Sequence, residues 1–249
     1  MLKMERHSFI LHQVNLHNKV LSTELSKQIN VSDDTIRRDL QHLADEGKII
    51  KTHGGALSLS FHYVHNNSQE VYGYTQKKII AQKAISLIRD GMFILTSGGT
   101  TIIELARALP ISLHATFISG SVPALFEYSS HPNIEVIAIG DKISKNSKIT
   151  VGSEAISKIK EIKADLCFLG VNAISLETGI SDNDWEVVQI KKAMVEASKK
   201  VICLTISEKI NSRQPFPVCD AKKIDTLITE LSPDDKLLVP YVNAGINVR

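Results

Sequence analysis

The chain has 249 residues, a formal net charge of +2 and 22% charged side chains, which is typical of an ordinary soluble protein. That length exceeds one small module and leaves room for a second domain of about 170 residues with its own core. No apolar run reaches the roughly 18 residues of a membrane span, and the N-terminus, with Lys3, Glu5 and Arg6, lacks a secretory signal. We therefore expect a cytoplasmic protein with no membrane partner.

Cysteine and histidine patterns do not indicate a metal site. The three cysteines, Cys167, Cys203 and Cys219, are far apart and odd in number, and two lie in apolar, strand-like runs. Buried thiols in a reducing compartment are therefore expected. The first three histidines recur every five residues and do not share a helical face, and no HExxH motif or cysteine pair accompanies them. We expect no metal and no cofactor.

Two short helices separated by a turn are the first predicted elements. Leu25 and Ile29 are one helical turn apart and give the first helix a small apolar face. Asn30-Val31 forms the turn, and Ser32 is a suitable N-cap for the second helix. Apolar residues then recur at i, i+4 and i+7 in the second helix, at Ile36, Leu40 and Leu43.

A tight hairpin is predicted after Gly47 ends the second helix. Residues 49–57 alternate around Gly54-Gly55, which suits the wing of a winged helix-turn-helix. In such proteins the outward face of the second helix reaches base edges. Arginine can grip guanine or phosphate, threonine offers a hydroxyl and a methyl group, and glutamine can pair with adenine. The candidate DNA-binding residues are Ser32, Asp34, Thr35, Arg37, Arg38, Gln41, Lys51 and His53.

A solvated helical hairpin that binds nothing is the competing interpretation. Asp34 and Arg38 have the i, i+4 spacing of an ion pair. Residues 1–60 carry eight Lys or Arg against seven Asp or Glu, which is nearly neutral for a DNA-binding module. Such a module binds weakly as a monomer, so two or more copies are expected to act together.

The run SDDTIRRDLQHLADEGKIIKTHGGA, residues 32–56, resembles the N-terminal domain of the DeoR family of bacterial transcriptional regulators. The opening MLKMERHSFIL matches the same family pattern. The resemblance implies a winged helix-turn-helix at 1–57, a linker at 58–76 and a sugar-phosphate-sensing domain at 77–249. It also implies three partners: a double-stranded DNA operator, a phosphorylated sugar effector, and further copies of the chain in a dimer or tetramer.

Strands and helices alternate regularly after the polar linker. Helices are predicted at 77–88, 101–109, 122–128, 153–162 and 184–197, and strands at 92–96, 115–119, 135–139, 165–170, 200–205 and 225–229. This order gives a mostly parallel sheet with helices on both faces. The fold class is therefore α/β with two domains, and ligands are expected at the carboxyl ends of the strands.

The first strand-to-helix junction of this second part, residues 97–101, reads Ser-Gly-Gly-Thr-Thr. Glycines allow a close approach by an anion, and a helix N-terminus offers free N–H groups. A tight turn with Thr as N-cap explains the same residues, and neither GxxxxGK[ST] nor a full GxGxxG is present. The resemblance favours phosphate, because the D-[SG]-G-T-T loop of the family aligns here and its L-A-D-x-S-K run aligns with residues 204–209. The implied phosphate-binding residues are Ser97, Gly98, Gly99, Thr100, Thr101 and Lys209.

Several family positions differ in this chain. An aspartate is replaced by Ser97, another by Asn172 in the G-V-D-G element and a third by Ile206, while Asp141 stands where the family has glycine. Fewer carboxylates mean fewer acid-base groups, which weakens the interpretation as an isomerase. The same differences leave open whether this chain binds the ligand that is usual in the family. The weaker effector-pocket candidates are Ser119, Gly120, Ser121, Asp141, Asn172, Asp184 and Lys191.

The start of the helix at 184–197 has two interpretations. Asn183 as N-cap with Glu186 three positions later predicts a capping box, whereas Asp182 or Asp184 could instead lie at the pocket rim. Lys191-Lys192 is predicted to be a solvated face, with Lys191 balancing a phosphate as the alternative.

Three functions remain in competition. The leading one is a ligand-gated transcription factor, expected to be a repressor of carbohydrate metabolism genes, with no catalytic residues. The second is a sugar-phosphate isomerase-like enzyme carrying a DNA-binding module. The third is a DNA-binding regulator whose effector pocket has decayed.

Overall fold

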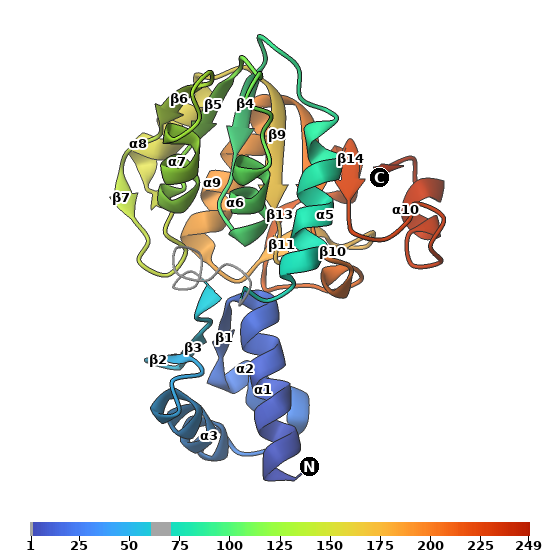
Figure 1. Cartoon of the computed structure of the whole chain (residues 1–249). Helices are drawn as coiled ribbons and strands as arrows, with labels where there is room; N and C mark the ends of the chain where they lie inside the picture. Colours follow the sequence, from blue (N-terminus) through green and yellow to red (C-terminus); the bar gives the residue numbers. More distant parts are fainter. Residues whose placement is uncertain (1, 61–70) are drawn as a thin grey trace. The chain divides into compact units, whose positions relative to one another are not determined.

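The computed structural model describes residues 2–60 and 71–249 and divides into two compact units, Met1–Tyr74 and Thr75–Arg249 (Figure 1). Each unit has its own apolar core. Within the described part of the chain, no helix is long and apolar enough to cross a membrane. Residues 61–70 of the predicted linker lie outside the described residues.

In the described part of the first unit, helices α1, α2 and α3 accompany a small antiparallel sheet in the order β1-β3-β2. Its elements are α1 (Lys3–His17), β1 (Lys19–Leu21), α2 (Ser22–Ile29), α3 (Asp33–Asp45), β2 (Ile50–Thr52) and β3 (Gly55–Leu57). The predicted pair of helices and the hairpin, α2, α3 and β2-β3, are confirmed. Strand β1 was not predicted, because three residues are too few to show a period.

Local sequence signals set the limits of α3. The Ser32 hydroxyl accepts a hydrogen bond from the backbone N–H of Thr35 at 3.3 Å, as an N-cap does. Beyond the last turn, Gly47 has φ +68°, a conformation that glycine adopts readily. The apolar face of α3 packs with α1 in one core that contains Ile10, Val14, Ile36, Leu40 and Leu43.

One buried carboxylate links α3 to α1. Asp39 accepts hydrogen bonds from the Arg6 guanidinium, with Nη2 3.1 Å from Oδ1, and lies 2.9 Å from Nε2 of His7. Burial opposes ionisation of Asp39, but the bonds from Arg6 and His7 outweigh it and hold the pKa of this carboxyl below its ordinary value. The aspartate of the T-I-R-R-D-L motif is therefore structural.

The second unit is built on a seven-stranded sheet in the order β15-β14-β12-β9-β4-β5-β6, with every neighbouring pair parallel. Its strands are β4 (Phe93–Thr96), β5 (Thr116–Ser119), β6 (Glu135–Ala138), β9 (Ala164–Gly170), β12 (Ser198–Leu204), β14 (Thr226–Ile228) and β15 (Asn247–Val248). Its helices are α5 (Tyr74–Ile85), α6 (Thr100–Arg107), α7 (Val122–Ser129), α8 (Ser153–Lys160), α9 (Trp185–Glu196) and α10 (Val239–Asn243).

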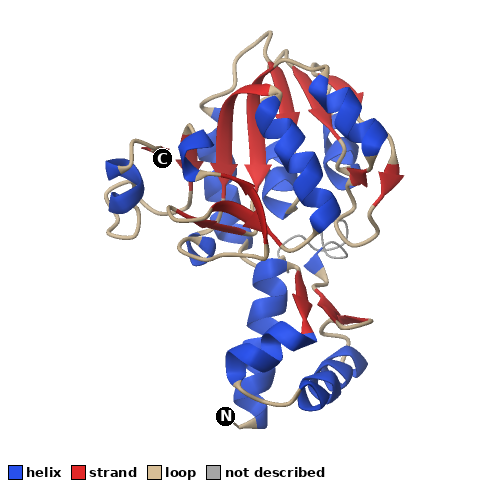
Figure 2. Ribbon diagram, turned by 180° about the vertical axis from the view of Figure 1, so that it is seen from behind, coloured by secondary structure: helices blue, strands red, loops and turns tan. Residues whose placement is uncertain are grey.

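Helices cover both faces of this sheet, as predicted. Helices α5, α6 and α7 lie on the face turned toward the viewer in Figure 1, and Figure 2 shows other helices over the opposite face. Two smaller antiparallel pieces were not predicted: the sheet β10-β11-β13 and the hairpin β7-β8. Their strands are β7 (Lys142–Ile143), β8 (Thr150–Val151), β10 (Ala173–Ser175), β11 (Gly179–Asp182) and β13 (Phe216–Cys219).

The start of α5 differs from the prediction. The helix begins at Tyr74, so residues 74–76, predicted as linker, are helical. The polar residues before Lys77 show no apolar period, and for this reason the sequence did not reveal the first turn. The cysteines agree with their prediction: Cys167 and Cys203 are buried, Cys219 is half-buried, and all three are free thiols.

Replacing Asp39 by asparagine is expected to destabilise the first unit by about 3 kcal/mol, since Arg6 would keep a half-buried charge without its partner. Hydrogen exchange at the α3 amides of the full chain would measure the loss. Asp34→Asn, which removes an exposed partner, should change exchange by less than about 1 kcal/mol. Because the folded pKa of Asp39 is lowered, its contribution is present above its unfolded pKa and is lost as pH falls through the folded value. Equal exchange in the two variants would contradict the structural role of Asp39.

Candidate functional site

The outward face of α3 carries paired charges. Arg37 forms an i, i+4 ion pair with Asp33 at 2.9 Å, and Arg38 forms another with Asp34. The side chains of Arg38 and Asp34 are 80% and 67% exposed, so water screens their attraction and the pair is weak. A DNA phosphate or a guanine edge can therefore replace these carboxylates at little cost.

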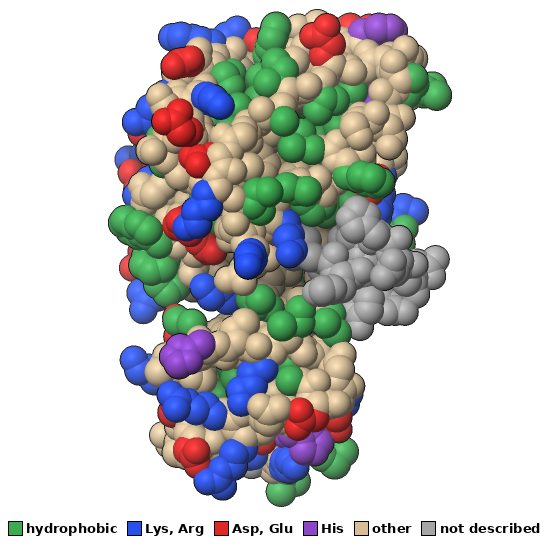
Figure 3. Space-filling view, turned by 90° about the vertical axis from the view of Figure 1, so that its left-hand side faces the viewer, with side chains coloured by type: hydrophobic (Ala, Val, Ile, Leu, Met, Phe, Trp, Pro, Cys, Tyr) green, Lys and Arg blue, Asp and Glu red, His purple; other side chains and the backbone are tan. Residues whose placement is uncertain are grey.

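The wing lies against the same face of α3. Lys51 of β2 donates to Oε1 of Gln41 at 2.8 Å, and Gln41 in turn donates to Asp45 at 2.7 Å. His53, at the tip of the hairpin, is exposed. In the view of Figure 3, Lys and Arg side chains of the smaller body alternate with acidic and histidine side chains. Of the predicted DNA-binding residues, Gln41 and Lys51 are thus joined across α3 and the wing, and Arg37 and Arg38 are each paired with a carboxylate.

The predicted effector residues meet at the carboxyl ends of the two central strands. The Ser97 hydroxyl, after β4, accepts a hydrogen bond from the backbone N–H of Gly170, the last residue of β9, at 2.9 Å. A Cβ atom at Gly170 would lie 2.8 Å from the carbonyl oxygen of Gly98. Helices leave β4 and β9 toward opposite faces of the sheet, so this point is the topological switch where α/β sheets bind ligands.

The N-terminus of α6 opens at this point. Gly99 is its N-cap with φ +115°, a conformation that favours glycine, and no side chain caps the helix. Thr100 and Thr101 in the first turn are buried. The Ser121 hydroxyl is fully buried, has no hydrogen-bond partner, and lies 3.5 Å from where a Cβ of Gly98 would be. Free helix N–H groups and an unsatisfied hydroxyl are the donors that an oxyanion requires.

Buried ammonium groups lie at the same edge. Lys209, at the end of a short 3-10 turn after β12, is 9% exposed and donates to the carbonyl oxygen of Val171 at 3.3 Å. Lys77, in the first turn of α5, is 6% exposed. Burial, together with the nearby charge of Lys209, lowers the pKa of Lys77 to about 7. Burial likewise lowers the pKa of Lys209 to about 8. Sequence patterns did not single out Lys77, because Lys77-Lys78 reads as the solvated start of a helix.

Lys191 is also buried, so the predicted solvated face is wrong at this residue. Its ammonium group forms an ion pair with Asp182 at 2.6 Å and donates to the carbonyl oxygen of Gly170 at 2.9 Å. Asn172 donates to the other oxygen of Asp182 at 2.7 Å. Burial raises the pKa of Asp182, but Lys191 and these hydrogen bonds outweigh it and hold the pKa below its usual value. Lys191 therefore joins the end of β9, at Gly170, to Asp182, and Asn172 holds the same carboxylate.

Two predicted pocket carboxylates instead cap helices. Asp184 accepts hydrogen bonds from the backbone N–H groups of Glu186 and Val187, at 3.1 and 3.4 Å, and is the N-cap of α9. The predicted capping box led by Asn183 is therefore wrong by one residue, and Glu186 pairs with Lys142 at 2.9 Å. Asp141 accepts from the N–H of Ala155 at 3.1 Å in the first turn of α8.

Ser119 and Gly120 shape the end of β5 through internal bonds. The Ser119 hydroxyl donates to the carbonyl oxygen of Thr96 at 3.0 Å and accepts from the N–H of Ser121 at 3.1 Å. The Gly120 carbonyl oxygen accepts from Thr150 of β8 at 2.8 Å. These two residues hold the loop rather than point donors at a ligand. The residues described contain no group of three or more His, Cys, Asp or Glu side chains placed to hold a metal ion.

Family models match both units. A DeoR-like helix-turn-helix domain matches residues 6–61, and a DeoR C-terminal sensor domain matches residues 73–231. The fold and the two sites thus define a helix-turn-helix regulator joined to a sensor. The chain belongs to the DeoR family of DNA-binding transcriptional regulators.

Relatives along the whole chain carry the same description. The transcriptional regulator GolR of Listeria innocua is 29% identical over 100% of this chain and 99% of its own length. The transcriptional repressor GlcR of Bacillus subtilis is 30% identical over 94% of this chain and 91% of its own. A ribose-5-phosphate isomerase bound to phospho-erythronic acid is 16% identical, with a TM-score of 0.40 over 54% of this chain and 52% of that chain. These two relatives are named as a regulator and a repressor, in agreement with the family to which the chain belongs.

Buried Lys77 and Lys209 predict how stability depends on pH. Their folded pKa values, about 7 and about 8, lie below those of exposed lysines. Between about pH 7 and about pH 8.5 the unfolded chain therefore binds more protons at these lysines, and the second unit should become more stable as pH rises. Above about pH 9 the three cysteine thiols, whose pKa values burial raises, act in the opposite direction. Thermal melts across this range would show the trend. Lys209→Met should flatten it and Lys78→Met, at an exposed position, should not; equal slopes in all three proteins would contradict it.

Proposed function

We propose that this regulator is a repressor of carbohydrate metabolism genes whose operator affinity changes when a phosphorylated sugar binds at the carboxyl ends of β4 and β9. The observation that carries the proposal is the uncapped N-terminus of α6 at Gly99, next to the buried, unpartnered hydroxyl of Ser121. Helix N–H groups, hydroxyl donors and a nearby ammonium group such as Lys209 suit a phosphate.

The surroundings of this site favour binding over chemistry. Ser97 and Asn172 replace carboxylates at the ends of β4 and β9, and their polar atoms are engaged with Gly170 and Asp182. Ile206 replaces a third carboxylate and is buried. No base is thus supplied at these positions to move a sugar proton. Phosphate donors remain, which supports a sensor.

Oligomerisation is part of the proposal. The DNA-reading surface carries ion-paired arginines and little net charge, so each copy contributes few phosphate contacts. Two or four copies on repeated half-sites would add their binding energies, as in other helix-turn-helix proteins. This reasoning supports a dimer or tetramer on DNA.

Lys209→Met tests the effector site. Losing a charge-assisted hydrogen bond costs about 1.5–3 kcal/mol, so affinity for the phosphorylated sugar that binds the wild type should fall about 10- to 150-fold. Titration calorimetry of the full chain, with a panel of sugars and their phosphates, measures this. Lys222→Met, at an exposed lysine, is the matched control. Binding of the unphosphorylated sugar as tightly as its phosphate would overturn the site.

Arg38→Ala tests the DNA surface. If Arg38 reads a base, the variant should lose about 1–3 kcal/mol at one operator position and tolerate other bases there. If Arg38 holds a phosphate, the loss should be uniform across sequences and the salt dependence shallower. Gel-shift titrations on operator variants at two salt concentrations separate these outcomes. Unchanged affinity on every sequence would remove α3 from the interface.

A further inference from the structure

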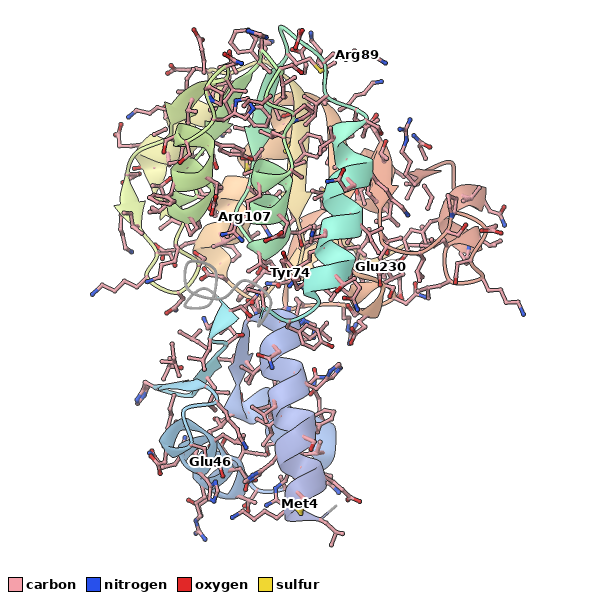
Figure 4. The ribbon with its side chains drawn as sticks, in the orientation of Figure 1. Met4, Glu46, Tyr74, Arg89, Arg107 and Glu230 are labelled. Atoms are coloured by element: carbon pink, nitrogen blue, oxygen red, sulfur yellow. The ribbon has the colours of Figure 1, made fainter. Side chains whose placement is uncertain are left out.

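Helix α5 carries a buried lysine, Lys77, whose charge interacts with that of Lys209. Lys77 lies in its first turn and is near enough to Lys209 and to Glu104 of α6 for their charges to act on it. Six residues further along, Lys83 donates to the carbonyl oxygens of Thr229 and Leu231 at 2.8 and 2.6 Å. The later turns of α5 are thus fixed by hydrogen bonds to the segment that follows β14, and Figure 4 labels Tyr74 at the start of the helix.

The residues just before α5 belong to the DNA-binding unit. The Tyr72 hydroxyl lies 3.2 Å from Nδ1 of His12 on α1, and the two rings meet edge to face at 5.9 Å. Val71 is buried, and its carbonyl oxygen accepts from the N–H of Tyr74 at 3.1 Å. Between them Gly73 has φ +65°. This conformation favours glycine. Gly73 is the single residue between Tyr72, which contacts His12 of α1, and Tyr74, where α5 begins.

Helix α1 carries the recognition helix with it. Arg6 and His7, one to two turns before His12, hold the buried Asp39 of α3. Movement of α1 therefore reaches α3 through a buried ionic contact and a shared apolar core.

We propose that the first turn of α5 is the coupling element of this regulator: anion binding engages Lys77, and the resulting shift passes through Gly73 to the Tyr72–His12 contact and so to α1 and α3. The inference rests on the proposed function and adds how the site regulates DNA binding. An effector couples two sites only if it has different free energies in two states. Here the two states differ in whether the first turn of α5 is drawn toward the bound anion.

Variants on the α1 side separate coupling from binding. His12→Ala and Tyr72→Phe leave both ligand sites intact, so each should bind the sugar phosphate and the ligand-free operator within about twofold of the wild type. The ligand should nevertheless change their operator affinity at least fivefold less than it changes that of the wild type. Fluorescence anisotropy of labelled operator, with and without saturating sugar phosphate, measures the effect. Ser8→Ala, exposed on the same helix, should behave as the wild type.

A variant on the sensor side tests the other end. Lys77→Met should weaken sugar-phosphate binding at least tenfold in the full chain, and Lys77→Arg should restore part of it. Lys78→Met should have no effect. Wild-type coupling in both His12→Ala and Tyr72→Phe, or wild-type ligand affinity in Lys77→Met, overturns the inference while the proposed function stands. A wild-type operator affinity that no sugar phosphate changes overturns the proposed gating itself.

Discussion

The hydrogen bond from the Gly170 backbone N–H to the Ser97 hydroxyl joins β4 and β9 at their carboxyl ends. In a fully parallel sheet every carboxyl end lies at one edge, so segments far apart in sequence must meet there. That constraint brings α6, the end of β9 and Lys209 together without any local sequence signal linking them. Lys191, which is paired with Asp182, also contacts this edge, because it donates to the carbonyl oxygen of Gly170. The site is therefore a consequence of strand direction, and its chemistry is decided by the residues placed there.

Charge is handled differently in the two units. In the sensor, ammonium groups are held out of water beside free N–H donors, which makes the edge receptive to an anion. On α3, Arg37 and Arg38 each have a carboxylate four residues earlier, so their positive charge is paired within the helix. A phosphate that contacts these arginines would first have to displace a carboxylate.

Local signals predicted most of the fold. The serine cap at Ser32, Gly47 after α3 and the strand-helix alternation all act within a few residues, and a single sequence shows them. What failed was set by partners distant in sequence. Lys191 was predicted to be solvated, but it is buried against Asp182, nine residues earlier in the chain. Asp141 was predicted to lie in the pocket, but its carboxylate accepts a hydrogen bond from the first turn of α8. Lys77 gave no signal, because nothing in the local sequence distinguishes this buried lysine from the exposed Lys78 beside it.

The buried free thiols of Cys167 and Cys203 allow the opening of the sensor sheet to be measured by chemical labelling. Cys167 and Cys203 lie on adjacent central strands, and burial raises the pKa of both thiols and of Cys219. A thiol reagent acts on the thiolate, so the closed sheet resists alkylation and mild oxidants. Modification must then wait for the strands to separate. The rate at which a reagent labels Cys167 and Cys203 thus follows the free energy of opening the sheet at each residue, without any engineered probe.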